Sequence, residues 1–371
     1  MTVDIEKNAD ITNTSQGDPY QLRKGYKSDK YLNNIYSRET RRLLHVVPCI
    51  KNHKIRRRKR VRQFYDRQNE KIEYMLRKIN DYSIEEKVGS EADYRKFQIA
   101  IYSSLVASLL LAALQVFAAV KSNSLCLFTT MASAVFDPLS NLALIISNLA
   151  IKRVNLNKFP SGKSRLETLG NISFCFIMTS VSLFLIILAI RELLGEATNA
   201  YSGLKVPSVI AVVVAFIVKL NLFLYCWGLK DKYSQVNILW QDHRNDLFIN
   251  GFAIIMNVLG SKFRWWIDPT GTIIISTIVS FIWLHAIFGE FLLLIGITAS
   301  FDIYQLITYI CATHSPTIQG LNTIRVYHSG PKLIAEIEIL MHPDRSLRQT
   351  RHVAEELQIK LQKLPDIERA Y

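Results

Sequence analysis

Residues 97–120 read FQIAIYSSLVASLLLAALQVFAAV, a run of 24 residues without a charged side chain. At about 1.5 Å of rise per residue, a helix of this length is about 36 Å long and crosses the roughly 30 Å hydrocarbon core of a bilayer. Such a run is typical of a transmembrane helix. The stretch therefore predicts that the chain is an integral membrane protein.

Five more apolar stretches follow, and with 97–120 they predict six transmembrane helices. They cover residues 125–151, 169–190, 206–229, 236–259 and 269–294. The pattern predicts a mostly α membrane protein with a six-helix transmembrane domain over residues 96–300.

The positions of Lys and Arg predict that both termini face the cytosol. A basic arm precedes the first stretch, and the second and fourth connections are also basic. The first connection carries only Lys121, and the fifth only Lys262 and Arg264. Six crossings return the chain to the side on which it started.

Residues 1–95 are expected to form a basic, partly disordered cytosolic region, in which 55–87 could be a polar helix. Much of the net charge of +14 lies between residues 41 and 62. Beside a membrane domain, such an arm favours binding to anionic lipid headgroups over a nucleic-acid partner.

The C-terminal part changes to a mixed pattern. Residues 322–328 and 332–341 read as strands around a turn, and 346–363 as an amphipathic helix. We expect a small α+β cytosolic domain over 315–371, truncated before its last strand, which would start near Ile367. Because so small a domain buries little surface alone, we expect it to form a homodimer.

Ionisable side chains inside the predicted helices suggest the chemistry, because each costs about 2.5–3.5 kcal/mol to insert. Residues four apart share one helical face. Two stripes of oxygen ligands result, one of Ser133, Asp137 and Asn141, and one of Asp242, Asp246 and Asn250. Facing each other, they would form a cage suited to a hard divalent cation.

Simpler readings stay open for several of these residues. Ser133, Asn141 and Asn250 could only hydrogen-bond helices together. Lys219 is expected to snorkel or to form an ion pair, with a role in transport as the alternative. His243 is expected to point to a different face from the aspartates and to reach a headgroup, a helix end or a carboxylate partner, and Glu290 to lie at the interface. The sequence shows no nucleophile–base pair typical of an enzyme and no cysteine pattern typical of zinc, so neither an enzyme nor a cofactor is expected.

Three segments carry a resemblance to a known family: SLCLFTTMASAVFDPLSN (124–141), KFPSGKSRLETLGN (158–171) and WQDHRNDLFINGF (240–252). They resemble cation diffusion facilitator transporters, and within these the manganese-type branch of fungi and plants. The resemblance implies a homodimer that exchanges a metal ion for protons at a site between the second and fifth helices. It also implies a DxxxD motif on each of these helices. This chain keeps the motif at Asp242 and Asp246 but has Ser133 before Asp137.

The resulting hypothesis is proton-coupled export of Mn²⁺, with Zn²⁺ possible, from the cytosol into an endomembrane lumen such as a vacuole or Golgi compartment. An Asp at 242, where the family's zinc branch carries His, favours Mn²⁺. The alternative is a transport-impaired homologue that partners or regulates an active transporter, since Ser133 removes one carboxylate.

The predicted topology can be tested by cysteine labelling. Lys158→Cys should react with an impermeant thiol reagent only from the cytosolic side, because its connection is basic. Phe263→Cys should react only from the lumenal side. The unsubstituted protein reports the background from native cysteines. Labelling of both positions from one side would contradict the six-helix topology.

Overall fold

The computed structural model describes residues 18–28, 30–32, 48–77, 79–122, 125–153, 163–194, 206–262 and 266–371. Within helices, side chains are described except at 48–58, 79–92, 118–133, 206–212, 253–262 and 268. Contacts divide the chain into two compact units. One contains residues 87–298 and 327–334, and the other contains residues 1–86, 299–326 and 335–371.

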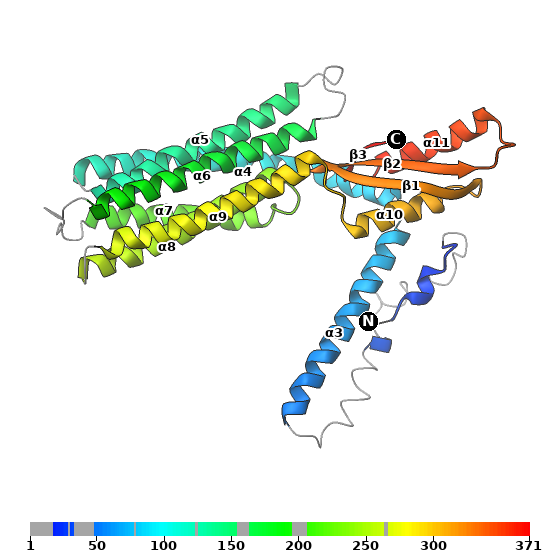
Figure 1. Ribbon diagram of the computed structural model, residues 1–371, viewed down its shortest axis with the longest axis horizontal. Coiled ribbons are helices and arrows are strands. Elements are labelled where there is room, and N and C mark those ends of the chain that lie inside the picture. The colour runs from blue at the N-terminus through cyan, green and yellow to red at the C-terminus, as the bar shows by residue number, and fades with distance from the viewer. Residues whose placement is uncertain are drawn as a thin grey trace. The chain divides into compact units, whose positions relative to one another are not determined.

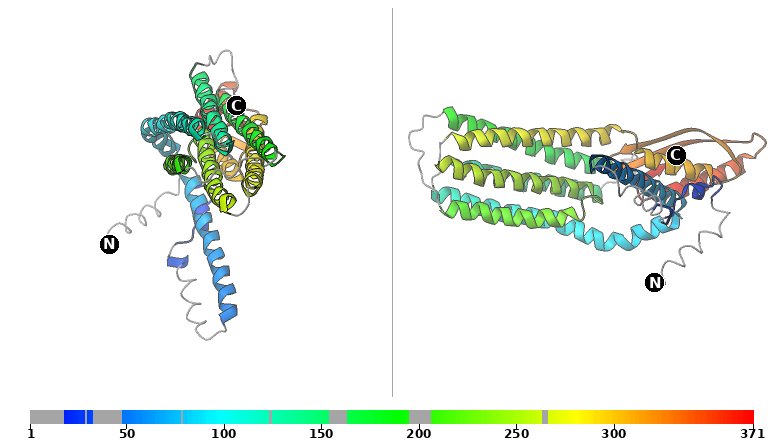
Figure 2. Two further views of the ribbon diagram at one scale, coloured as in Figure 1. Left: turned by 90° about the vertical axis from the view of Figure 1, so that its left-hand side faces the viewer. Right: turned by 90° about the horizontal axis from the view of Figure 1, so that it is seen from below.

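Long helices run side by side in the first unit (Figures 1 and 2). Each contains one of the predicted apolar stretches. They are α4 (Ile79–Ser122), α5 (Leu125–Arg153), α6 (Ser164–Leu194), α7 (Val206–Trp227), α8 (Ser234–Lys262) and α9 (Ile267–Ile295). Helix α4 begins well before the predicted start at residue 97, because a polar helical segment precedes its apolar part.

Among the described residues, four helices are long and apolar enough to cross a membrane. Their segments are Asp93–Phe117, Ala134–Arg153, Ser164–Leu194 and Pro269–Ile295, and Val213–Trp227 forms a shorter apolar helix. Four of the six predicted spans are therefore supported by helix length and apolar composition, and the count of six remains a prediction. Phe176, Phe281 and Phe288 are 66%, 68% and 62% exposed, as expected for side chains that face lipid.

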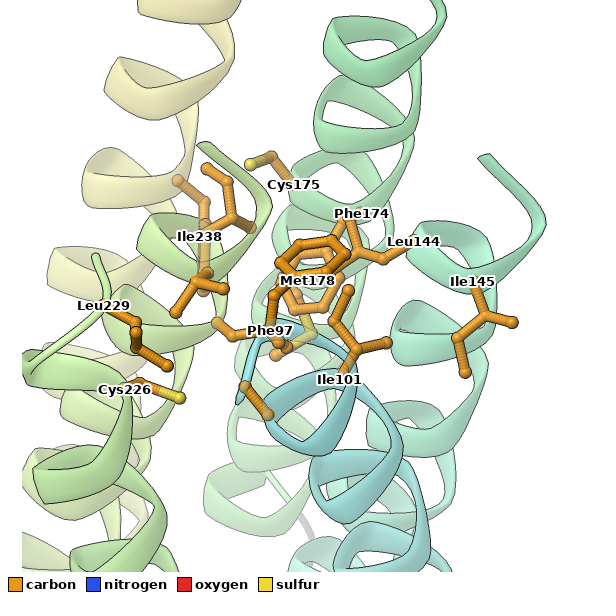
Figure 3. Packing of buried hydrophobic residues seen from close by; sticks show 14 of the residues in the cluster. Phe97, Ile101, Leu144, Ile145, Phe174, Cys175, Met178, Cys226, Leu229 and Ile238 are labelled. Atoms are coloured by element: carbon orange, nitrogen blue, oxygen red, sulfur yellow. The ribbon is translucent and has the colours of Figure 1, made fainter. Parts of the chain in front are cut away.

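Buried apolar side chains from the helices of this unit meet in one cluster (Figure 3). The rings of Phe174 on α6 and Trp283 on α9 lie 5.7 Å apart between centroids. Around them pack residues from the other helices: Phe97 and Ile101, Leu144, Cys226 and Leu229, and Ile238. This apolar layer fixes the helices next to the polar residues described below.

Helices α5 and α6 approach closely at a small residue. The Ser147 hydroxyl on α5 donates to the Leu166 carbonyl of α6 at 2.7 Å. A Cβ atom on Gly170 would collide with the Ser147 side chain. Glycine is thus required at 170 by the close approach of the two helices.

A three-stranded sheet, most of which belongs to the second unit, has the order β1 (Ile318–Ser329), β2 (Lys332–Met341), β3 (Ile367–Ala370). Helix α11 (Leu347–Gln362) packs against β3 and buries Leu357 and Leu361. Its N-cap, Ser346, accepts a hydrogen bond from the amide of Gln349. Helix α10 (Phe301–Ala312) follows α9 in the chain. The predicted strands and amphipathic helix are confirmed.

The expectation that the last strand is missing was wrong. Residues 367–370 form β3, whose Ile367 and Ala370 are buried. Next to it, the amide of Tyr371 donates to the Ala335 carbonyl at 2.9 Å, and the amide of Ile337 donates to the Tyr371 carbonyl at 3.0 Å. A strand of four residues is long enough because it adds to an existing edge.

The N-terminal part contains more regular structure than its composition suggests. A 3₁₀ helix, η1, covers Leu22–Gly25, and α3 covers Pro48–Leu76. The Asn69 side chain of α3 accepts a hydrogen bond from the Lys27 amide at 2.9 Å and donates one to the Lys27 carbonyl at 2.6 Å. The polar helix predicted at 55–87 is therefore present as α3 and the start of α4. The disorder expected before residue 18 and at 33–47 falls outside the described residues, as do most side chains of the basic arm.

Two glycines inside helices give a matched test of the packing. Gly170→Ala should lower the stability by about 1–3 kcal/mol, because the methyl group overpacks the contact with Ser147. Gly289→Ala, on α9, has open space around the new atom and should stabilise by about 0.5–1 kcal/mol. Thermal unfolding in detergent measures both. Equal effects of the two substitutions would contradict the close approach.

Candidate metal site

Three aspartates and one lysine meet inside the helix unit. Asp242 and Asp246 lie one turn apart on α8, Asp137 comes from α5 and Lys219 from α7. The Lys219 ammonium lies 3.0 Å from Asp137 Oδ2 and 3.9 Å from Asp242 Oδ2, and it also pairs with Asp246 Oδ2. The i, i+4 spacing on α8 thus brings both carboxylates to the α5 aspartate, as the sequence predicted.

Lys219 does not reach the membrane surface. Its side chain is 4% exposed, and its nitrogen lies among all three carboxylates. Of the two expectations for this residue, the ion pair describes it and snorkelling does not. A single positive charge therefore faces three acidic side chains.

Asp242 is the most unusual member of the group. It is 1% exposed, and neither of its carboxylate oxygens accepts a hydrogen bond from any described residue. A buried carboxylate without partners is costly unless it is protonated or meets a cation. The orphaned oxygens fit a metal ligand.

Pro138, next to Asp137, removes the usual helical hydrogen bond of one backbone carbonyl oxygen. Pro138 lies inside α5 and has no amide hydrogen, so the Ala134 carbonyl loses its usual intrahelical partner. Ala134, Asp137 and Asp246 line one cavity of about 50 Å³. This volume holds a few water molecules, so a cation bound there would have lost most of its hydration shell.

The remaining predicted ligands separate into different environments. Asn250 lines the same cavity as Asp137 and Asp246. Asn141 instead donates to Ser108 of α4 at 3.0 Å, and its own Oδ1 has no partner among the described residues. This is the helix-joining role left open above. Ser133 lies within α5, but its side chain is outside the described residues.

His243 lies closer to the carboxylates than its position in the sequence suggested. Its Nε2 hydrogen-bonds Ser104 of α4 at 3.1 Å, on a different face of α8 from Asp242. Its Nδ1, however, lies 3.8 Å from Asp242 Oδ2. Ligand atoms of Asp242, His243 and Asp246 all fall within 4.8 Å of one another, close to the separation that one bound ion allows.

Two cavity residues were not singled out from the sequence. Gln115 of α4 and Asn245 of α8 both line the cavity. The Oε1 atom of Gln115 and the Nδ2 atom of Asn245 are buried without partners among the described residues. For Gln115 the available clue was a polar amide within an otherwise apolar span, whereas Asn245 stands among charged residues that hid it.

A second polar contact lies elsewhere in the unit. Asn171 of α6 donates to Ser234 of α8 at 2.7 Å and to Glu290 of α9 at 3.2 Å. Glu290 is 9% exposed and lies near the end of α9, and its predicted place at the membrane interface stays a prediction. Because its partner is an amide on a neighbouring helix, the carboxylate can be buried.

Comparison with known proteins gives a consistent result. Residues 101–295 match the cation efflux transmembrane domain. Metal tolerance protein 3 of Oryza sativa subsp. japonica is 30% identical over 285 residues, which cover 76% of this chain and 68% of that protein. Metal tolerance protein 10 of Arabidopsis thaliana is 28% identical over 323 residues, covering 85% and 75%. The putative metal tolerance protein C3 of Arabidopsis thaliana is 28% identical over 321 residues, covering 84% and 78%.

Proposed function

The chain belongs to the cation efflux family and is a divalent cation efflux transporter, and we propose that its cargo is Mn²⁺, moved from the cytosol into an endomembrane lumen in exchange for protons. Proteins of this family are transporters and not enzymes, and the metal ion is their cargo, not a cofactor.

The observation that carries the proposal is the convergence of Asp137, Asp242 and Asp246 on one buried point. Their carboxylates, the Asn250 amide and the Ala134 carbonyl, which lacks its usual helical donor, all offer oxygen, which hard cations such as Mn²⁺ prefer. Zn²⁺ more often takes nitrogen or sulfur. Among the described residues near the carboxylates, His243 adds one nitrogen, its Nδ1, while its Nε2 bonds Ser104, so oxygen atoms outnumber nitrogen in the set. The ligand set therefore favours Mn²⁺ over Zn²⁺.

The proposed architecture follows the sequence. Residues 96–300 form six spans with both termini in the cytosol, residues 1–95 contact anionic lipids, and residues 315–371 form the dimerisation domain. Family members generally act as homodimers in membranes. In this chain Leu340, Leu347 and Ile359 are 52%, 85% and 56% exposed on the C-terminal domain, and contact with a second copy would remove such apolar side chains from water.

Metal flux into vesicles tests the site. The wild-type protein should transport Mn²⁺ faster than Zn²⁺, and Asp137→Ala and Asp246→Ala should reduce flux by about 100-fold or more, because each removes an anionic ligand. Asp93→Asn is a matched control. This carboxylate of α4 pairs with Lys96 and Lys232 instead and should leave flux unchanged.

Ser133→Asp completes the family's DxxxD motif on α5 and should raise Mn²⁺ affinity or flux. Full transport by Asp246→Ala would place the cargo elsewhere. If the wild-type protein moves neither metal and Ser133→Asp transports, the alternative of a transport-impaired homologue is favoured.

The oligomeric state is a separate prediction. The full chain in mild detergent should have the mass of a homodimer by light scattering. Leu347→Asp should weaken the dimer if the contact includes α11, because it replaces an exposed apolar side chain with a charge. Asp344→Ala, on the exposed loop before α11, is the control and should leave it intact. A wild-type monomer that persists at high protein concentration would contradict the proposal.

A further inference from the structure

We propose that the Lys219 ammonium is a tethered competitor of the cargo, which occupies the aspartates in the empty site and has to leave them before a divalent cation can bind. The inference rests on the proposed function, since it concerns the same three carboxylates. It assigns to α7, which contributes none of the family's carboxylate motif, a residue that sets how tightly the site holds metal.

The first argument is geometric. The ammonium contacts Asp137 and Asp246 directly and lies 3.9 Å from Asp242. A divalent cation binds carboxylate oxygens at about 2.0–2.6 Å and needs the same oxygens. Two cations that share these oxygens would be only a few ångströms apart inside an apolar bundle, where their repulsion is poorly screened. Lysine and cargo therefore exclude each other from this position.

The second argument concerns where the lysine can go. Its side chain has a flexible four-carbon stem, so the ammonium can move without displacing α7. Lys219 lines the same cavity as Gln115, whose Oε1 is buried without a partner among the described residues. Ser182 of α6 adds a hydroxyl to the lining. A displaced ammonium thus finds acceptors within the protein.

The third argument is the charge of the site. Three carboxylates with Lys219 carry a net −2, which a divalent ion balances. Without Lys219 they carry −3 and attract a divalent ion more strongly. Ser133 stands where the family motif has a carboxylate, so it also lowers the negative charge of the site, as the lysine does. Both features weaken metal binding, so the chain should respond to a higher metal concentration than a relative with four carboxylates and no lysine.

The simpler explanation is that Lys219 only joins α5, α7 and α8 as a structural ion pair. The two readings predict opposite results when the charge is removed. A structural lysine lowers stability and metal binding together when it is lost. A competitor lowers the stability of the empty protein but strengthens metal binding.

The test uses the full chain in detergent and measures ⁵⁴Mn²⁺ binding by equilibrium dialysis. Lys219→Met keeps the stem and removes the charge, and it should bind Mn²⁺ about tenfold more tightly or better. Lys219→Arg keeps the charge and should bind no more tightly than wild type. Lys230→Met is the control, because Lys230 stacks on Trp240 at 4.0 Å and contacts none of the aspartates. If Lys219→Met binds Mn²⁺ with the affinity of the wild type, the proposal that Lys219 competes with the cargo is wrong.

Thermal unfolding gives a readout that does not depend on transport. In EDTA, Lys219→Met should melt below wild type, because three acidic groups lose their counter-ion. Added Mn²⁺ should raise its Tm by more than it raises that of wild type. If Lys219→Met does not fold, Lys219→Gln, which keeps a hydrogen-bond donor, takes its place. If neither folds in EDTA, rescue by Mn²⁺ supports the competitor, and failure of Mn²⁺ to rescue overturns it.

Asp246→Asn separates failure of this inference from failure of the proposed site. It should abolish Mn²⁺ binding both alone and combined with Lys219→Met. If the double variant binds as well as Lys219→Met, the metal lies elsewhere and the proposed site is wrong. If Asp246→Asn abolishes binding but Lys219→Met matches wild type, the site stands and the tethered competitor does not.

Discussion

The helix unit depends on one constraint, which is that burying a polar side chain inside an apolar bundle is costly unless a partner, often on a neighbouring helix, meets it. The cluster of Lys219 with the three aspartates joins α5, α7 and α8. His243 and Ser104 join α8 to α4, and Asn141 and Ser108 join α5 to α4. Asn171, Ser234 and Glu290 join α6, α8 and α9. Each helix from α4 to α9 is therefore held by at least one buried polar contact, and the apolar cluster fills the space between these contacts.

Helix α8 takes part in most of these contacts, which explains its composition. It places aspartates toward α5 and α7, a histidine toward α4 and a serine toward α6. A helix surrounded by partners can carry polar groups on several faces, whereas helices that face lipid on one side cannot. The same crowding leaves the buried Asp242 carboxylate without a hydrogen bond from any described residue, so a bound cation would stabilise it.

The positions of the helices were predictable because the apolar length of a span is a local property of the sequence. The i, i+4 pair on α8 was predictable for the same reason. How each helix is rotated about its axis is not local, since it depends on neighbours far away in the chain. For that reason the direction of Lys219, the bond from Asn141 to Ser108 and the burial of Glu290 did not follow from the sequence. Strand β3 was missed because its few residues gain their stability from the edge of β2.

The ion cluster also bears on how the protein is made. Helix α8 is not among the described helices long and apolar enough to cross a membrane, and its charged groups each cost about 2.5–3.5 kcal/mol to insert. Helix α7 precedes it, carries the positive charge of Lys219 and no acidic residue of its own, and is joined to it by a connection of only six residues, 228–233. Opposite charges that meet within such a hairpin lower the cost for both helices, so the two would leave the translocon as a pair. Lys219 would then ease the insertion of α8 in addition to pairing its aspartates.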